Sequence, residues 1–91
     1  MSVPDKADQA IEHESIAFTT TAKQADFQCL CTGATFYPTQ DCHIAFDGEV
    51  ATTGSFFLKA SVGIDIPDIQ FTKVSCIRDS SDGTLYILAR R

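Results

Sequence analysis

Three cysteines and a histidine lie close together in the sequence and could in principle bind a metal ion. Cys29 and Cys31 are separated by one residue, and Cys42 is followed directly by His43. Thiolate and imidazole are ligands that zinc accepts, but common structural sites use cysteine pairs spaced by two to four residues. In a β-strand, Cys42 and His43 would also point to opposite faces. We therefore predict no metal site and expect the cysteines to fill the core as small apolar residues.

Disulfide bonds are the second kind of chemistry that the cysteines allow. Cys31 could pair with Cys42, and Cys76 could pair with Cys29. Only the geometry of the fold decides between these pairings. Because the first residues do not have the composition of a secretory signal, we expect synthesis in a cytoplasm and reduced thiols.

Catalytic constellations are not recognisable in the chain. Cys42 and His43 are sequence neighbours, whereas the members of a catalytic dyad are usually distant in sequence, and no third group or oxyanion loop accompanies them. Aspartates that flank turns usually cap their own backbone. Two carboxylate pairs are of this kind: Asp65 with Asp68, and Asp79 with Asp82. No phosphate-binding glycine pattern occurs. We predict no catalytic residue and no cofactor, and hence a protein that is not an enzyme.

Length and charge restrict the possible partners. The chain has 91 residues, enough for one small domain. Its net charge is −5, and its seven lysines and arginines form no obvious basic face. A nucleic-acid partner would need such a face. No apolar run is long enough to cross a bilayer. We therefore expect no nucleic-acid partner and no membrane partner.

Alternation of apolar and polar residues predicts β-strands from residue 15 onward. In residues 83–90, for example, Leu85, Ile87 and Ala89 share one face and Tyr86 and Leu88 the other. Turn-forming residues separate the alternating runs. The runs are residues 15–22, 25–33, 42–48, 54–60, 68–79 and 83–90. This pattern predicts an all-β fold, a small antiparallel β-sandwich or jelly-roll-like barrel of six to eight strands with an N-terminal arm.

Two details of strand pairing follow from the same pattern. Residues 70–89 are predicted to form a hairpin around the turn from Asp79 to Gly83. Within that hairpin, Phe71 and Lys73 are predicted to share a face. The acidic residues 1–14 are predicted to form an arm or a short helix, and residues 15–91 the sandwich domain.

Two strands carry apolar residues on both faces, which points to contacts with a partner. Adjacent phenylalanines on a strand must point in opposite directions, so one of them needs a cover. The candidate interface residues are Phe56, Phe57, Tyr86 and Leu88. A tightly closed sandwich covered by its own N-terminal arm would explain the same residues. We expect a homo-oligomer.

The segments CHIAFDGEVATTGSFFLKA and FTKVSCIRDSSDGTLYILAR resemble small β-sandwich virion proteins of tailed bacteriophages, of the capsid decoration or head-fibre type. The likeness covers residues 42–91 and, loosely, residues 15–41. It implies a structural protein of the virion, made in the host cytoplasm, that binds the major capsid protein or other virion proteins through apolar strand faces and its arm. Alternatives are a glycan-binding module of a phage tail or fibre, and a small cysteine-rich metal-binding protein.

Overall fold

The computed structural model describes residues 11–90, which form eight β-strands. Every strand pairs with its neighbours in antiparallel fashion. In the described residues no helix is long and apolar enough to span a membrane. The strands are β1 (Ile11–Phe18), β2 (Lys23–Cys31), β3 (Gly33–Pro38), β4 (Cys42–Phe46), β5 (Phe56–Leu58), β6 (Ile64–Ile66), β7 (Phe71–Arg78) and β8 (Gly83–Arg90).

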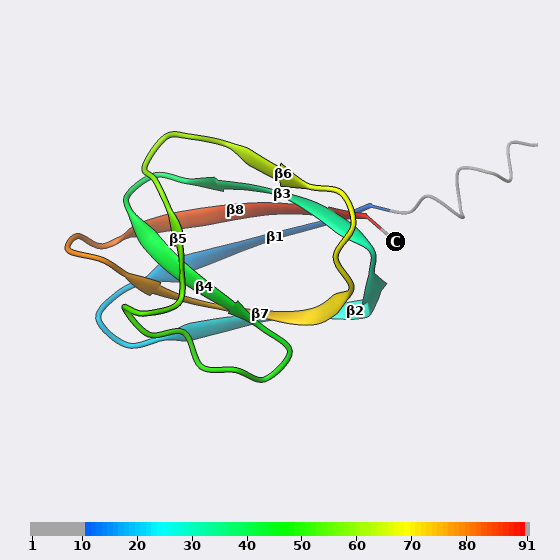
Figure 1. Ribbon diagram of the computed structural model, residues 1–91, viewed down its shortest axis with the longest axis horizontal. Coiled ribbons are helices and arrows are strands. Elements are labelled where there is room, and N and C mark those ends of the chain that lie inside the picture. Colours follow the sequence, from blue (N-terminus) through cyan, green and yellow to red (C-terminus); the bar gives the residue numbers. More distant parts are fainter. Residues whose placement is uncertain (1–10, 91) are drawn as a thin grey trace, which may run out of the picture.

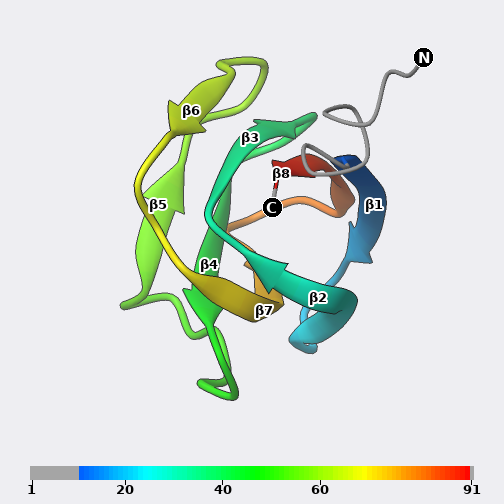
Figure 2. The ribbon, with the colours of Figure 1, turned by 90° about the vertical axis from the view of Figure 1, so that its right-hand side faces the viewer.

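The strands are arranged in two four-stranded sheets (Figure 1). Sheet A has the order β1-β8-β3-β6, and sheet B has the order β2-β7-β4-β5. Seen in Figure 2, the two sheets follow opposite arcs around a common interior. Eight strands in two such sheets, with the chain passing repeatedly between them, make a jelly roll. The predicted all-β sandwich of jelly-roll type is therefore confirmed.

The predicted hairpin of residues 70–89 is wrong. Strand β7 pairs with β2 and β4 in sheet B, whereas β8 pairs with β1 and β3 in sheet A. The turn from Asp79 to Gly83 therefore carries the chain from one sheet to the other. Turn residues show that the chain reverses direction, but they do not show whether the next strand pairs with the preceding one. The β4–β5 pairing is local, with His43 opposite Phe57.

Aromatic side chains fill the space between the sheets. Phe36 and Phe71 are fully buried. The ring of Phe71 lies edge-on to Phe27, with centroids 5.4 Å apart, and 5.3 Å from that of Phe46. Phe46 also contacts Phe36, with centroids 6.0 Å apart. Interior positions of small β-barrels and sandwiches are normally filled in this way. These rings therefore form a packed aromatic core between the sheets.

The predicted placement of Phe71 and Lys73 on one face is also wrong. Phe71 and Val74 both face the core, whereas Lys73 is exposed. The strand is irregular here: its register against β2 shifts between Asp26 and Cys31, and one carboxylate oxygen of Asp47 accepts hydrogen bonds from the backbone N–H groups of both Thr72 and Lys73, at 2.7 and 3.3 Å. Two consecutive N–H groups that point to one acceptor are incompatible with regular alternation.

The first strand begins at Ile11, four residues before the predicted start of the sandwich domain. Ile11 pairs with Arg90 and Glu14 with Ile87, so residues 11–14 belong to sheet A rather than to an arm or helix. Residues 1–10 lie outside the described part of the chain, and the predicted arm stays a prediction there.

Candidate functional site

A groove of about 490 Å³ runs over the outer face of sheet A. Strand register sets out its side chains in two rows. Ser15, Tyr86 and Tyr37 lie side by side on β1, β8 and β3. His13, Leu88 and Thr35 form the second row, two residues further along each strand. Directly opposed side chains on neighbouring strands have Cβ atoms about 5 Å apart. The groove is thus built by β-alternation, which sends the intervening residues towards the core.

The two tyrosines dominate the surface of this groove. Tyr37 is 43% exposed and Tyr86 is 53% exposed. No described residue is hydrogen-bonded to either phenol, to the hydroxyl of Ser15 or to the imidazole of His13. The face therefore offers two ring surfaces together with several free hydrogen-bonding groups.

A polar cluster adjoins Thr35, in the second row of the groove. The Thr35 hydroxyl donates to an Asp65 carboxylate oxygen at 2.7 Å, and the Arg90 guanidinium donates to the same oxygen at 3.0 Å. These two hydrogen bonds hold the pKa of Asp65 below its ordinary value, so the carboxylate is ionised at neutral pH. Arg90 and Asp65 thus neutralise each other in this cluster.

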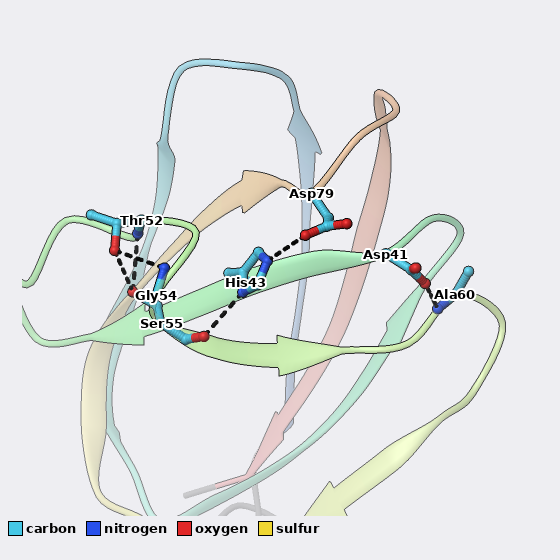
Figure 3. A network of polar contacts seen from close by, with 7 residues as sticks. All are labelled: Asp41, His43, Thr52, Gly54, Ser55, Ala60 and Asp79. Atoms are coloured by element: carbon cyan, nitrogen blue, oxygen red, sulfur yellow. Dashed lines mark hydrogen bonds and ion pairs between the residues drawn. The ribbon is translucent and has the colours of Figure 1, made fainter.

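The second notable site is a buried imidazole on the opposite side of the sandwich. His43 lies on the outer face of sheet B, yet it is only 6% exposed. Its Nδ1 lies 3.0 Å from the carbonyl oxygen of Ser55, and its Nε2 lies 2.8 Å from an Asp79 carboxylate oxygen (Figure 3). Its ring also contacts Phe57, with centroids 5.4 Å apart. Both ring nitrogens therefore face acceptors.

The pKa of His43 is raised above its ordinary value of 6.5. Burial alone would lower it, because burial disfavours the charged form. The hydrogen bonds to Asp79 and to the Ser55 carbonyl, with the negative charges of Asp79 and Asp41, outweigh that effect. Within residues 11–90, no serine, threonine or cysteine side chain is hydrogen-bonded to the ring, so the pair of His43 and Asp79 does not resemble an activated nucleophile.

The cysteines are core residues as far as their side chains are described. Cys31, Cys42 and Cys76 are all buried. Cys42 and Cys76 lie on neighbouring strands, and hydrogen bonding between their thiols, together with burial, raises the pKa of Cys76. Among the described residues, no three His, Cys, Asp or Glu side chains converge so as to hold a metal ion. The structure thus brings Cys42 to Cys76, a pairing that the sequence did not suggest.

The predicted interface residues do not form one surface. Tyr86 and Leu88 lie in the groove of sheet A, whereas Phe56 and Phe57 lie on β5, at the edge of sheet B. Phe56 and Phe57 are about half exposed. A role of either pair in self-association stays a prediction. The sequence reasoning missed His13, Ser15, Thr35 and Tyr37 as groove residues, because alternation shows the face of a strand but not its neighbours.

Comparisons with known proteins give one structural match. No family model matches the sequence, and no curated protein does. Among solved structures, a cupin-2 domain containing protein from Shewanella frigidimarina NCIMB 400 matches with a TM-score of 0.44 and 14% sequence identity. The match covers 92% of this chain and 72% of that chain.

This comparison overturns the resemblance to bacteriophage proteins. The matching structure is described as a cupin-2 domain containing protein, and neither a family model nor a curated protein of bacteriophages matches the sequence. The resemblance rested on strand and turn sequences, which recur in unrelated β-sandwiches. The predicted function as a capsid decoration protein is therefore wrong, and so is its alternative as a phage tail or fibre module.

Proposed function

We propose that this protein is a non-enzymatic binding module whose ligand lies on the two tyrosines of sheet A. The observation that carries the proposal is the register of β3 and β8, which sets Tyr37 directly beside Tyr86 in an open groove of about 490 Å³. Small-molecule sites usually have volumes of about 300 to 1,000 Å³ and combine apolar or aromatic walls with a few polar groups. The groove has this composition.

The charges around the groove favour an uncharged ligand. The chain carries a net charge of −5, which disfavours anions. The guanidinium of Arg90 is already paired with Asp65. Glu14 lines the groove, but it alternates with His13 and Ser15 and its side chain is directed to the other face of β1. Neither a free cation nor a free carboxylate is therefore directed at a ligand on the outer face of these strands.

The shape and the polar groups of the groove further define the ligand. An open groove leaves one side of its ligand in water, so a wholly apolar molecule would gain little from binding there. The tyrosine rings suit a flat apolar face, and the phenols, the Ser15 hydroxyl and the His13 imidazole suit hydroxyl groups at its rim. The proposed ligand is an uncharged ring compound that carries several hydroxyl groups.

The tyrosines themselves provide the assay. The chain has two tyrosines and no tryptophan, so its fluorescence above the phenylalanine absorption band comes from the groove alone. We expect cyclic polyols or neutral monosaccharides to change this emission saturably, with a Kd on the order of 1 mM or lower. The same compounds carrying a phosphate group are expected to bind less well.

Matched variants separate binding in the groove from binding elsewhere. Tyr86→Ser removes one ring from the groove and is expected to weaken binding by about tenfold or more, measured by ligand-observed NMR. Phe57→Ser removes an exposed ring from sheet B and is expected to leave binding unchanged. A panel without any saturable binder, or equal weakening by both variants, would refute the proposed site.

A further inference from the structure

Residues 47–55, which we term the strap, connect β4 to β5 and cover part of the outer face of sheet B. The covering is visible in the burial of outward-facing residues. His43 and Ser75 point away from the core in their strands, and both are nonetheless buried. Ala51 of the strap is buried as well, and its N–H donates to the Ser75 hydroxyl at 3.0 Å. The strap is thus a packed part of the molecule.

The two ends of the strap are held by different chemistry. At the first end, Asp47 is in the left-handed region, with φ 51°, and its carboxylate accepts the N–H groups of Thr72 and Lys73. At the far end, the carbonyl oxygen of Ser55 lies 3.0 Å from Nδ1 of His43. No other described residue outside the strap is hydrogen-bonded to Ser55. The imidazole is therefore the side-chain contact that holds the Ser55 carbonyl, and the next residue, Phe56, pairs with Ile44 in sheet B.

Residues 52–55 form a turn that is closed by its own hydrogen bonds (Figure 3). The N–H of Ser55 donates to the carbonyl of Thr52 at 2.9 Å, and the N–H of Thr52 donates to the Ser55 hydroxyl at 3.0 Å. The N–H of Gly54 donates to the Thr52 hydroxyl at 3.2 Å. Because the turn is internally satisfied, it can shift away from the imidazole without unfolding, while Ala51 before it and Phe56 after it stay attached to sheet B.

The imidazole satisfies both of its neighbours only when it is charged. A neutral imidazole has one N–H group, so it can donate to the Ser55 carbonyl or to the Asp79 carboxylate but not to both. Because a carboxylate is the stronger acceptor, the single N–H is better placed on Nε2, and Nδ1 then directs a lone pair at the Ser55 carbonyl oxygen. The imidazolium donates to both, and it gains the attraction of a carboxylate.

We propose that His43 is a proton-operated clip, which fastens the 52–55 turn of the strap to sheet B when protonated and releases it when neutral. The charged groups that act on the ring are Asp79, from the connection between β7 and β8, and Asp41, from the connection between β3 and β4. Both are carboxylates, and their negative charges favour the protonated, positively charged ring. The strap is consequently closed on the acidic side of the transition and loosened on the alkaline side.

NMR spectroscopy of the full chain, followed from about pH 5 to about pH 9, tests the clip directly. The chain has two histidines, and His13→Gln identifies the ring signals of His43. We expect the His43 midpoint to lie above 6.5. The backbone amides of Gly54 and Ser55 should shift with the same midpoint, and their heteronuclear NOE should fall on the alkaline side.

Two aspartates on the connection between β7 and β8 supply a matched pair of variants. Asp79→Asn removes the carboxylate at Nε2 and should lower the midpoints of the ring and of the two amides together by about one pH unit, a tenfold loss of proton affinity. Asp82→Asn, which breaks only the exposed ion pair with Arg78, should leave them unchanged. Amides of Gly54 and Ser55 that do not follow His43, or a His43 midpoint at or below 6.5, would overturn the proposal.

Discussion

Neighbouring residues of β3 should differ sharply in their effect on stability, because one belongs to the core and the other to the groove. Phe36 is fully buried and packs against Phe46 and Phe71, whereas Tyr37 is 43% exposed. Truncation of a buried phenylalanine costs about 3 to 5 kcal/mol. A change at an exposed position usually costs less than about 1 kcal/mol. Phe36→Ala should therefore destabilise the fold several times more than Tyr37→Ala.

The expected loss is large for a domain of this size. At about 0.05 to 0.15 kcal/mol per residue, the free energy of unfolding of 91 residues is about 5 to 14 kcal/mol. With a urea m-value of about 1 to 3 kcal/mol/M, a loss of about 4 kcal/mol lowers the urea midpoint by roughly 1 to 4 M. Urea unfolding followed by circular dichroism measures both variants. Equal losses for Phe36→Ala and Tyr37→Ala would refute the assignment of inner and outer faces.

Two further predictions concern the strap and the thiols. Asp47→Ala should lower the melting temperature at neutral pH, because the carboxylate accepts the N–H groups of Thr72 and Lys73, and these hydrogen bonds lower its pKa below 3.8. Because the pKa of Asp47 is lower in the folded state, the ionised carboxylate stabilises the fold at pH values above 3.8, and this stabilisation is lost as the pH falls through the folded pKa. The difference in melting temperature between Asp47→Ala and the native chain should therefore be smaller in acid than at neutral pH. An equal difference in acid and at neutral pH would contradict this reasoning. Cys42 and Cys76 should resist alkylation in the folded protein, because both are buried and the pKa of Cys76 is raised. Peptide mapping after treatment with iodoacetamide measures the rate at which each thiol is modified. Modification of either thiol as fast in the folded protein as in urea would contradict the prediction.

The fold class was predictable because the side-chain period of a strand is visible in the sequence. The alternation of Leu85, Ile87 and Ala89 with Tyr86 and Leu88 agrees with burial in the structure. Strand pairing was not predictable in the same way. Each strand of a jelly roll pairs mainly with strands distant in the sequence, so the turn from Asp79 to Gly83 looked like a hairpin although it joins two sheets.

The candidate sites were less accessible from the sequence than the core. Tyr37 and Tyr86 are 49 positions apart, and only the β3–β8 register sets them side by side. His43 was considered as a metal ligand or a catalytic base, whereas its contacts come from Ser55 and Asp79, on two separate connections. No local sequence pattern indicates such contacts, because they depend on how connections that are distant in the sequence meet over the outer face of a sheet.

The most direct test of the central claim is a map of ligand-induced shifts in the backbone amide spectrum of the full chain. The probe is the neutral ring compound that gives the largest saturable change in tyrosine emission. We expect the shifts to concentrate on the groove strands around Tyr37 and Tyr86, and to leave β4, β5 and the strap unchanged. Shifts concentrated on residues of the packed interior, such as Phe27 and Phe71, or on sheet B, would contradict a binding site on the outer face of sheet A.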